Sequence, residues 1–227
     1  MIERIKEIQK NIEKAAKKRG KSLEDITLVA VSKTFPIEKI VEGYKFGLKI
    51  FGESRLQEAR DKIDRLMDLE DIKFHLIGHI QTNKIKLIKD SFSLIQTVDS
   101  INLADKLDNY FRSFNHRQDI LIQVNLVNEP QKYGIKIEEL PKLLEFIKDK
   151  KFLNLRGFMF IPPYYENPEL NRENYRKMFK LFDNIKNRYT HFNVFDTLSM
   201  GMSDDYEIAI EEGSTMVRIG SAIFGRR

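Results

Sequence analysis

Cysteine and tryptophan are absent from the 227 residues of this chain. Without cysteine the chain has no disulfide bond, no thiolate metal ligand and no cysteine nucleophile. No apolar run approaches the roughly 20 residues that a membrane-spanning helix requires. The first residues place Ile2, Ile5, Ile8 and Ile12 at helical spacing between charges, which indicates an amphipathic helix rather than a signal peptide. We therefore expect a cytoplasmic protein.

A dense basic arm is also lacking, although the formal net charge is +5. The 39 basic residues are interleaved with 34 acidic ones along amphipathic helical patterns, whereas a nucleic-acid footprint shows clustered lysine and arginine. Hydrophobic residues make up 41% of the chain and charged residues 32%, which is typical of a folded globular protein. We expect no binding to nucleic acid or to a membrane.

Short apolar runs alternate with helical patterns along the whole chain. The runs that we interpret as strands cover residues 26–32, 49–52, 74–78, 94–98, 120–126, 155–161, 197–200 and 216–219. The patterns that we interpret as helices cover residues 37–47, 55–67, 83–89, 102–114, 137–150, 171–189 and 204–212. Nearly continuous apolar strands separated by helices are typical of parallel strands that are covered on both faces.

Eight strands joined by seven crossover helices predict an α/β fold, a single closed (β/α)8 TIM barrel with an extra helix at the N-terminus. A doubly wound open sheet is the alternative, and it usually carries a glycine-rich turn after its first strand. Here that position reads Lys33-Thr34-Phe35-Pro36, without glycine, so we prefer the barrel. No proline- or glycine-rich linker divides the chain, and we expect one domain over residues 1–227.

A lysine, Lys33, ends the first predicted strand and would lie on the rim where TIM barrels carry their active sites. Partial desolvation disfavours an ammonium group, and a neutral amine is the form that attacks an aldehyde to give a Schiff base. A solvated lysine at the end of a strand is the alternative. The position of Lys33 alone favours that alternative. The choice between a Schiff-base lysine and a solvated one therefore depends on the other loops of the rim.

Serine, glycine and arginine gather where the last two predicted strands end. Ser199 and Gly201 follow the seventh strand, while Arg218, Gly220 and Ser221 close the eighth. Loops at these places frequently bind phosphate in TIM barrels, and glycine lets backbone amides approach an anion closely. The sequence therefore predicts an anion site on the same rim as Lys33.

Between these loops, Ser203 or Asp204 is interpreted as the N-cap of a helix, with Glu207 at capping-box spacing from Asp204. The acidic residues at this helix start disfavour a phosphate that lies directly on it. We expect the anion instead at Ser199 and at the amides near Gly201 and Gly220.

Two histidines, His75 and His79, are four residues apart, as in helical zinc sites. Their segment is predicted as a strand and its exit, where four residues span about 13 Å. One ion would not bridge that distance, so we expect no metal site.

Seven segments of the chain occur together in the order found in one known family. They read VAVSKTFP, FGESRLQEARDKI, FHLIGHIQTNKIK, IQTVDS, LIQVNLVNEPQKYGI, LRGFMFIP and LSMGMSDDYEIAIEEGSTMVRIGSAIFG. Over nearly its whole length the chain resembles the pyridoxal phosphate homeostasis protein family, once called proline synthetase co-transcribed proteins. The resemblance implies a barrel of the alanine racemase N-terminal type that carries pyridoxal 5′-phosphate (PLP).

By this resemblance, Lys33 would form the Schiff base with the cofactor aldehyde. Arg218 would face the pyridine nitrogen, and a cation there keeps the nitrogen unprotonated and weakens the ring as an electron sink. The residues that the resemblance assigns to the phosphate are Ser199, Gly201, Gly220 and Ser221.

Two positions bear on how far the resemblance extends. Family members commonly have Gly-Glu-Asn after the second strand, whereas this chain has Ser54 in place of the asparagine, which leaves an amide contact to the cofactor open. Lys132 matches a lysine that is often present in the loop after the fifth strand. A solvated loop lysine is the favoured interpretation of Lys132.

Racemases of this fold place an acid–base tyrosine from a second domain opposite the lysine, and we do not expect that domain because the sequence ends at Gly225-Arg226-Arg227. Racemisation through two bases needs an acid on each face of the substrate. Tyr164 or Tyr165 could supply the second acid, but a surface loop explains both residues more simply.

We therefore expect a PLP-binding protein of cofactor homeostasis, which stores, buffers or delivers PLP with little or no amino-acid turnover. A weak or narrow PLP-dependent racemase is the first alternative. A barrel enzyme that uses a lysine Schiff base without a cofactor, as in aldolases, is the second. Expected partners are PLP and PLP-dependent apo-enzymes that receive it. The predicted helices show no extra apolar stripe, so we expect a monomer.

Overall fold

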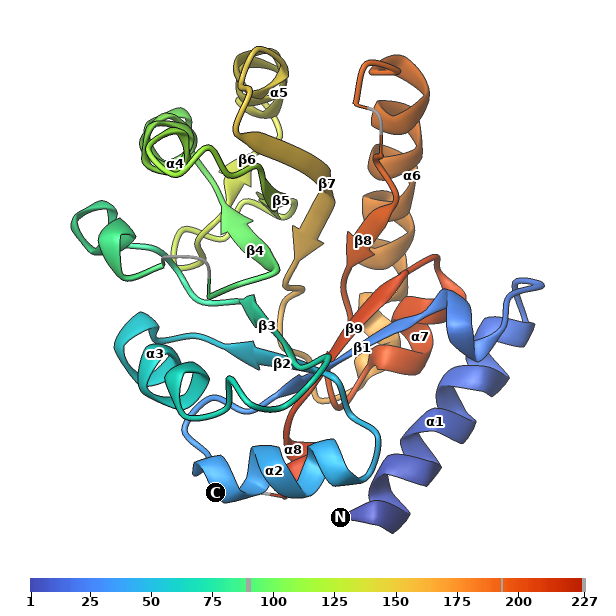
Figure 1. Cartoon of the computed structure of the whole chain (residues 1–227). Coiled ribbons are helices and arrows are strands. Elements are labelled where there is room, and N and C mark those ends of the chain that lie inside the picture. Colours follow the sequence, from blue (N-terminus) through green and yellow to red (C-terminus); the bar gives the residue numbers. More distant parts are fainter. Residues whose placement is uncertain (89–90, 193, 226–227) are drawn as a thin grey trace.

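Eight parallel strands close into a barrel in the computed structural model of the chain, which describes residues 1–88, 91–192 and 194–225 (Figure 1). The ring closes where β4 pairs with β5 and where β1 pairs with β9. Its strands are β1 (Thr27–Val31), β2 (Ile50–Glu53), β3 (Lys73–Leu76), β4 (Leu94–Val98), β5 (Gln118–Asn125), β7 (Leu153–Phe160), β8 (Thr197–Ser199) and β9 (Met216–Ile219). A two-residue strand, β6 (Ile135–Lys136), pairs with the carboxyl end of β5. The predicted TIM barrel is confirmed.

Helices surround this ring (Figure 1). The α-helices are α1 (Ile2–Lys17), α2 (Ile37–Lys45), α3 (Leu56–Asp64), α4 (Ile101–Arg112), α5 (Leu140–Lys148), α6 (Arg172–Arg188), α7 (Tyr206–Glu211) and α8 (Ser221–Phe224). The 3-10 helices are η1 (Leu23–Asp25), η2 (Thr82–Leu87) and η3 (Pro168–Asn171). Six of the seven predicted crossover helices overlap an α-helix, and the predicted helix at the N-terminus is α1.

The third crossover differs from its prediction as a regular helix over residues 83–89. The structure has the 3-10 helix η2 there, and residue 89 lies outside the described residues. Thr82 and Asn83, which begin the segment, are poor helix formers, and segments this short often adopt the tighter 3-10 geometry.

Two apolar layers follow from the alternation of side chains along each strand. Val29, Leu94, Leu121, Met159 and Met216, from five different strands, form a small buried cluster in the barrel interior. The intervening strand residues face outward and join the buried helix faces in one large cluster. Because inward and outward positions alternate, the residues at the strand ends point alternately into the barrel mouth and into the helix layer.

Helix α1 contributes Ile5, Ile8, Ile12 and two alanines to the outer layer, and it packs against α7 and α8. Figure 1 shows α1 running beside the β1–β9 side of the barrel. None of the helices within the described ranges has the length and apolar character needed to cross a membrane.

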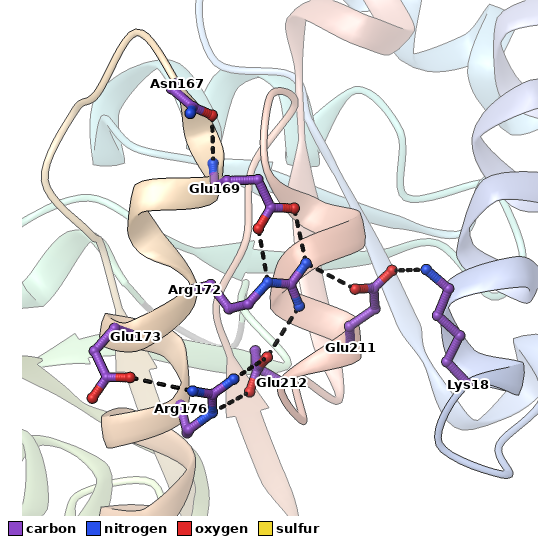
Figure 2. A network of polar contacts seen from close by, with 8 residues as sticks. All are labelled: Lys18, Asn167, Glu169, Arg172, Glu173, Arg176, Glu211 and Glu212. Atoms are coloured by element: carbon purple, nitrogen blue, oxygen red, sulfur yellow. Dashed lines mark hydrogen bonds and ion pairs between the residues drawn. The ribbon is translucent and has the colours of Figure 1, made fainter.

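A network of ion pairs ties α1, α6 and α7 together on the surface (Figure 2). Arg172, at the start of α6, pairs with Glu169 at 2.7 Å, with Glu211 at 3.0 Å and with Glu212 at 3.0 Å. Glu211 also binds Lys18, directly after α1. Single surface pairs stabilise little, but a network with a bidentate arginine is geometrically specific. The network fixes α7, and with it the outer end of the loop after β8.

Gly157 marks the closest backbone approach between β7 and β8. It has φ +146°, and a Cβ atom there would lie 1.9 Å from the carbonyl oxygen of Thr197. Gly20 also has positive φ (+66°), but a Cβ atom there would meet nothing within 4 Å. A φ of +66° lies in the left-handed region that some other residues adopt, whereas φ +146° is almost confined to glycine, so Gly157 is constrained both by its backbone conformation and by its close contact.

We predict that Gly157→Ala lowers the free energy of unfolding by about 1–3 kcal/mol more than Gly20→Ala does, the usual range for overpacking. Gly157→Ala meets a costlier backbone conformation and a contact that forces β7 away from β8, whereas Gly20→Ala meets only the milder cost of a left-handed residue. Urea unfolding of both variants and the unsubstituted protein measures the difference. Equal losses would show that the close approach is not a constraint.

Candidate functional site

A cavity of about 470 Å³ opens at the carboxyl ends of the strands. Val31, at the end of β1, lines it together with Lys33, two residues further along the chain. Of the other predicted site residues, Arg218, Gly220 and Ser221 also line this cavity. Its remaining wall is largely apolar and includes Val31, Phe35, Ile77, Met159 and Ile161. The barrel thus brings four of the six predicted residues around one cavity.

The guanidinium group of Arg218 lies at the inner end of this cavity. Arg218 stands on β9 in register with Val29 of β1, and only 4% of its surface is exposed. Its Nη1 donates to Ser199 Oγ at 2.6 Å, and its Nη2 donates to the carbonyl oxygen of Phe160 at 2.9 Å. Burial lowers the pKa of Arg218 to about 10. The group therefore keeps its positive charge at neutral pH.

A chain of buried hydrogen bonds extends from Arg218 across the barrel interior. Ser199 Oγ donates to Gln96 Oε1 at 2.7 Å, and Gln96 Nε2 lies 3.0 Å from His75 Nδ1. Burial lowers the pKa of His75 to about 3, so its ring is neutral and Nδ1 accepts from the Gln96 amide. With the Phe160 carbonyl, four strands supply the groups that orient one guanidinium.

Two backbone amides at the start of α8 point at a single oxygen atom. Gly220 N and Ala222 N donate to Ser203 Oγ, at 3.2 Å and 3.3 Å. Ser203 also lines the cavity beside Gly220 and Ser221. Converging amides of this kind form an anion-binding concavity. Two amide donors therefore lie at the rim with the Ser203 hydroxyl as their acceptor, and an anion site there stays a prediction.

The interpretation of Ser203 or Asp204 as a helix N-cap is wrong. Helix α7 begins after Asp205, and Asp205 Oδ1 accepts from Met202 N at 2.7 Å. The Ser203 side chain instead turns toward α8. Sequence reasoning missed Ser203 as a site residue, because its hydroxyl contacts a segment 17 residues later in the chain.

Ser199 and Gly201 do not line the cavity, but both contact Arg218, which does. The Ser199 hydroxyl faces the barrel interior between Arg218 and Gln96. Gly201 has φ +95°, and its carbonyl oxygen accepts from Arg218 N at 3.0 Å. Both residues contact the arginine, and their assignment to a phosphate stays a prediction.

Lys132 is not a simply solvated loop lysine. Its Nζ donates to the carbonyl oxygen of Pro162 at 2.7 Å and pairs with Glu129 at 2.8 Å. It thus joins the loop after β5 to the loop after β7. Tyr164 is 83% exposed and Tyr165 is 39% exposed, and neither lines the cavity.

The chain is similar to known proteins over almost its whole length. The model of the alanine racemase N-terminal domain matches residues 4–227. The pyridoxal phosphate homeostasis protein of Aquifex aeolicus is 42% identical over 226 residues, which cover 99% of this chain and 97% of that protein. The chain belongs to the pyridoxal phosphate homeostasis protein family.

Solved structures of similar proteins have the same fold. PipY of Synechococcus elongatus without PLP is 30% identical, with a TM-score of 0.88 over 99% of this chain and 100% of that one. With PLP bound, PipY has a TM-score of 0.84 over 93% of this chain and 100% of that one. An alanine racemase of Clostridium difficile, 15% identical, shares the fold with a TM-score of 0.68 over 96% of this chain and 55% of that one.

His75 gives the buried chain a pH dependence. Its pKa is about 3 in the folded protein and 6.5 without the fold, so the unfolded state binds the proton more readily. The stability that depends on neutral His75 is complete above pH 6.5 and is lost as pH falls toward 3, by up to about 1.4 kcal/mol per pH unit.

We predict that His75→Asn, which keeps an acceptor for Gln96 but does not titrate, flattens the loss of stability between pH 6.5 and 4. Urea unfolding at half-unit steps of pH measures the slope. His116→Asn, at an exposed position, is the control and should leave the slope unchanged. Parallel slopes for His75→Asn and the unsubstituted protein would contradict a neutral buried His75.

Proposed function

We propose that this chain binds PLP through a Schiff base to Lys33 and stores, buffers or delivers it within the cell. The observation that carries the proposal is one cavity that combines the amine of Lys33, the converging amides of Gly220 and Ala222, and the charged Arg218. Membership of a family whose members are named for PLP homeostasis supports the same conclusion.

The residues of the cavity fit this ligand. The cavity volume of about 470 Å³ falls in the range of roughly 300–1,000 Å³ for small-molecule pockets. Bound PLP supplies an aldehyde, which a lysine amine attacks. The rim amides, now donating to Ser203 Oγ, suit a phosphate oxygen, which is an acceptor of the same kind. The apolar wall provides contacts for an aromatic ring.

The charge of Arg218 supports a carrier over a racemase. A guanidinium donates hydrogen bonds and has no acceptor, so beside a pyridine nitrogen it favours the unprotonated ring. An unprotonated ring withdraws electrons weakly from a substrate carbon. Arg218 keeps its charge even at its lowered pKa of about 10, so this effect holds throughout the physiological pH range.

The ionisable groups around the cavity support the same choice. Racemisation needs proton donors on both faces of the substrate carbon, within hydrogen-bond reach. In the described part of the chain, the ionisable side chains that line the cavity are Lys33, Asp204 and Arg218. The exposed Tyr164 and Tyr165 lie outside this lining, which supports their interpretation as surface-loop residues.

We propose further that residues 1–227 act as one domain and as a cytoplasmic monomer, and that PLP-requiring apo-enzymes receive the cofactor. The cavity opens at the barrel mouth, so a transferred ligand would leave toward a partner at that face. Ser199 and Gly201 complete the proposed cofactor site through their contacts with Arg218.

We predict that the purified protein stays yellow after incubation with PLP and removal of the unbound PLP, and that Lys33→Ala abolishes this protein-bound absorbance. Borohydride reduction followed by peptide mass spectrometry should place the modification on Lys33. Lys132→Ala, which removes a second lysine of the rim loops, is the matched control and should keep the colour. A colourless protein would sink the proposal and favour a lysine enzyme without cofactor. A Lys33→Ala variant as yellow as its parent would show that Lys33 does not hold the cofactor.

We predict that the PLP-loaded protein exchanges the α-proton of L-amino acids with heavy water no faster than free PLP does. The reason is the weak electron withdrawal imposed by Arg218. Proton NMR on each amino acid in turn measures the exchange, with an alanine racemase as the positive control. Sustained exchange at enzymatic rates for any amino acid would favour the racemase alternative.

A further inference from the structure

A second polar cluster lies behind Lys33, on the outer side of the barrel wall. Ser32 precedes Lys33 and faces outward, because side chains alternate along the strand. It meets Glu53 at the end of β2 and Lys62 on α3. Ser32 and Glu53 are completely buried, and the Lys62 side chain is only 9% exposed. Lysine is among the residues least often buried, so this lysine requires an explanation.

All three hydrogens of the Lys62 ammonium group have acceptors. Nζ donates to Glu53 Oε1 at 2.9 Å, to Glu58 Oε1 at 2.7 Å and to the carbonyl oxygen of Ser32 at 3.0 Å. Ser32 Oγ in turn donates to Glu53 Oε1 at 2.6 Å. We name Glu53, Glu58 and Lys62 the strand-end clamp.

The clamp also holds the residue that follows Lys33. Thr34 N donates to Glu58 Oε1 at 2.7 Å, the same oxygen that accepts from Lys62. Thr34 has φ +65° although it is not glycine. A left-handed threonine persists only where the surroundings determine it. Glu58 is the neighbour that binds its amide.

Hydrogen bonds from one cluster therefore fix the backbone on both sides of Lys33. We infer that the strand-end clamp positions Lys33, because it sets the direction in which the lysine side chain leaves the chain toward the cavity. Glu58 and Lys62 act as positioning residues, since Lys62 holds Ser32 and Glu58 holds Thr34. What Lys33 binds rests on the proposed function, whereas the clamp itself does not.

The direction of Lys33 matters because the other end of the ligand is held independently. Arg218 lies on β9, Gly220 lies between β9 and α8, and Ala222 lies on α8. None of these residues belongs to the clamp. The amine of Lys33 must reach one carbon atom of a ligand that these groups already orient. Errors of about 1 Å in such alignments cost on the order of 100-fold in reaction rate. Loss of the clamp should therefore affect covalent capture far more than non-covalent binding.

Glu58 offers the cleanest test, because it is 26% exposed and its replacement leaves little empty volume. Glu58→Ala removes the acceptor of Thr34 N, whereas Glu58→Gln keeps an oxygen at that place. The probes are PLP and 4′-deoxypyridoxine 5′-phosphate, which has the same ring and phosphate but a methyl group instead of the aldehyde. Visible absorbance follows capture of PLP, and calorimetry follows binding of the deoxy compound.

We expect Glu58→Ala to slow the appearance of the PLP colour by about 10- to 100-fold and to leave the affinity for the deoxy compound unchanged. Glu58→Gln should restore most of the capture rate. Lys62→Met, which removes the donor that holds the Ser32 carbonyl oxygen, should slow capture in the same way. A parallel loss for both ligands, or an unchanged capture rate in Glu58→Ala, would overturn the positioning role.

A readout without PLP separates the clamp from the proposed function. Acetic anhydride at limiting concentration, followed by mass spectrometry, reports the reactivity of Lys33 relative to the exposed Lys180 on α6. We expect this ratio to change in Glu58→Ala and to return in Glu58→Gln. An unchanged ratio contradicts the clamp, whatever the protein binds. A parent protein that never becomes yellow contradicts the proposed function alone.

Discussion

A buried positive charge inside the barrel is the constraint on which the rest of the site depends. Arg218 has no ion pair with a carboxylate among the residues that the structure describes. Neutral acceptors must therefore take the place of the water molecules that would hydrate an exposed guanidinium. The Phe160 carbonyl and the Ser199 hydroxyl do so, and the hydroxyl needs an acceptor of its own. Gln96 provides it and in turn requires His75 to be neutral. A charged histidine at the end of this chain would add a second buried cation.

The same arginine connects the interior to the loops of the rim. Its backbone amide binds the carbonyl oxygen of Gly201, where a Cβ atom would lie 2.6 Å from Ala209 Cβ. The loop after β8 is therefore pressed between β9 and α7, and the ion pairs of Arg172 hold α7 from outside. Ser203 leaves this loop toward the amides of α8. The place where Ser203 meets these amides thus follows from the packing of β9 as well as from the loop itself.

Much of the fold and part of the site could be predicted, because they depend on local pattern. Strand periodicity located all eight barrel strands, and strand ends identified Lys33, Arg218, Gly220 and Ser221 as cavity residues. Contacts between distant strands escaped prediction, since Ser199 and Gln96 meet across 103 positions of the chain. Elements as short as β6 and α8 have too few residues to show a period. The Ser203 hydroxyl was misread because capping patterns assume a partner within the same helix.

Two polar networks flank the barrel wall at the mouth, and they differ in what they fix. The interior chain orients Arg218, which would meet the ring, whereas the outer clamp holds the backbone around Lys33. They share no residue, because the interior chain uses inward-facing side chains and the clamp uses outward-facing ones. A cofactor store needs its covalent bond to be reversible without losing the ligand's orientation. Separate supports for the amine and for the ring satisfy that need. The bond to Lys33 can break while the contacts of Arg218 with the ring remain.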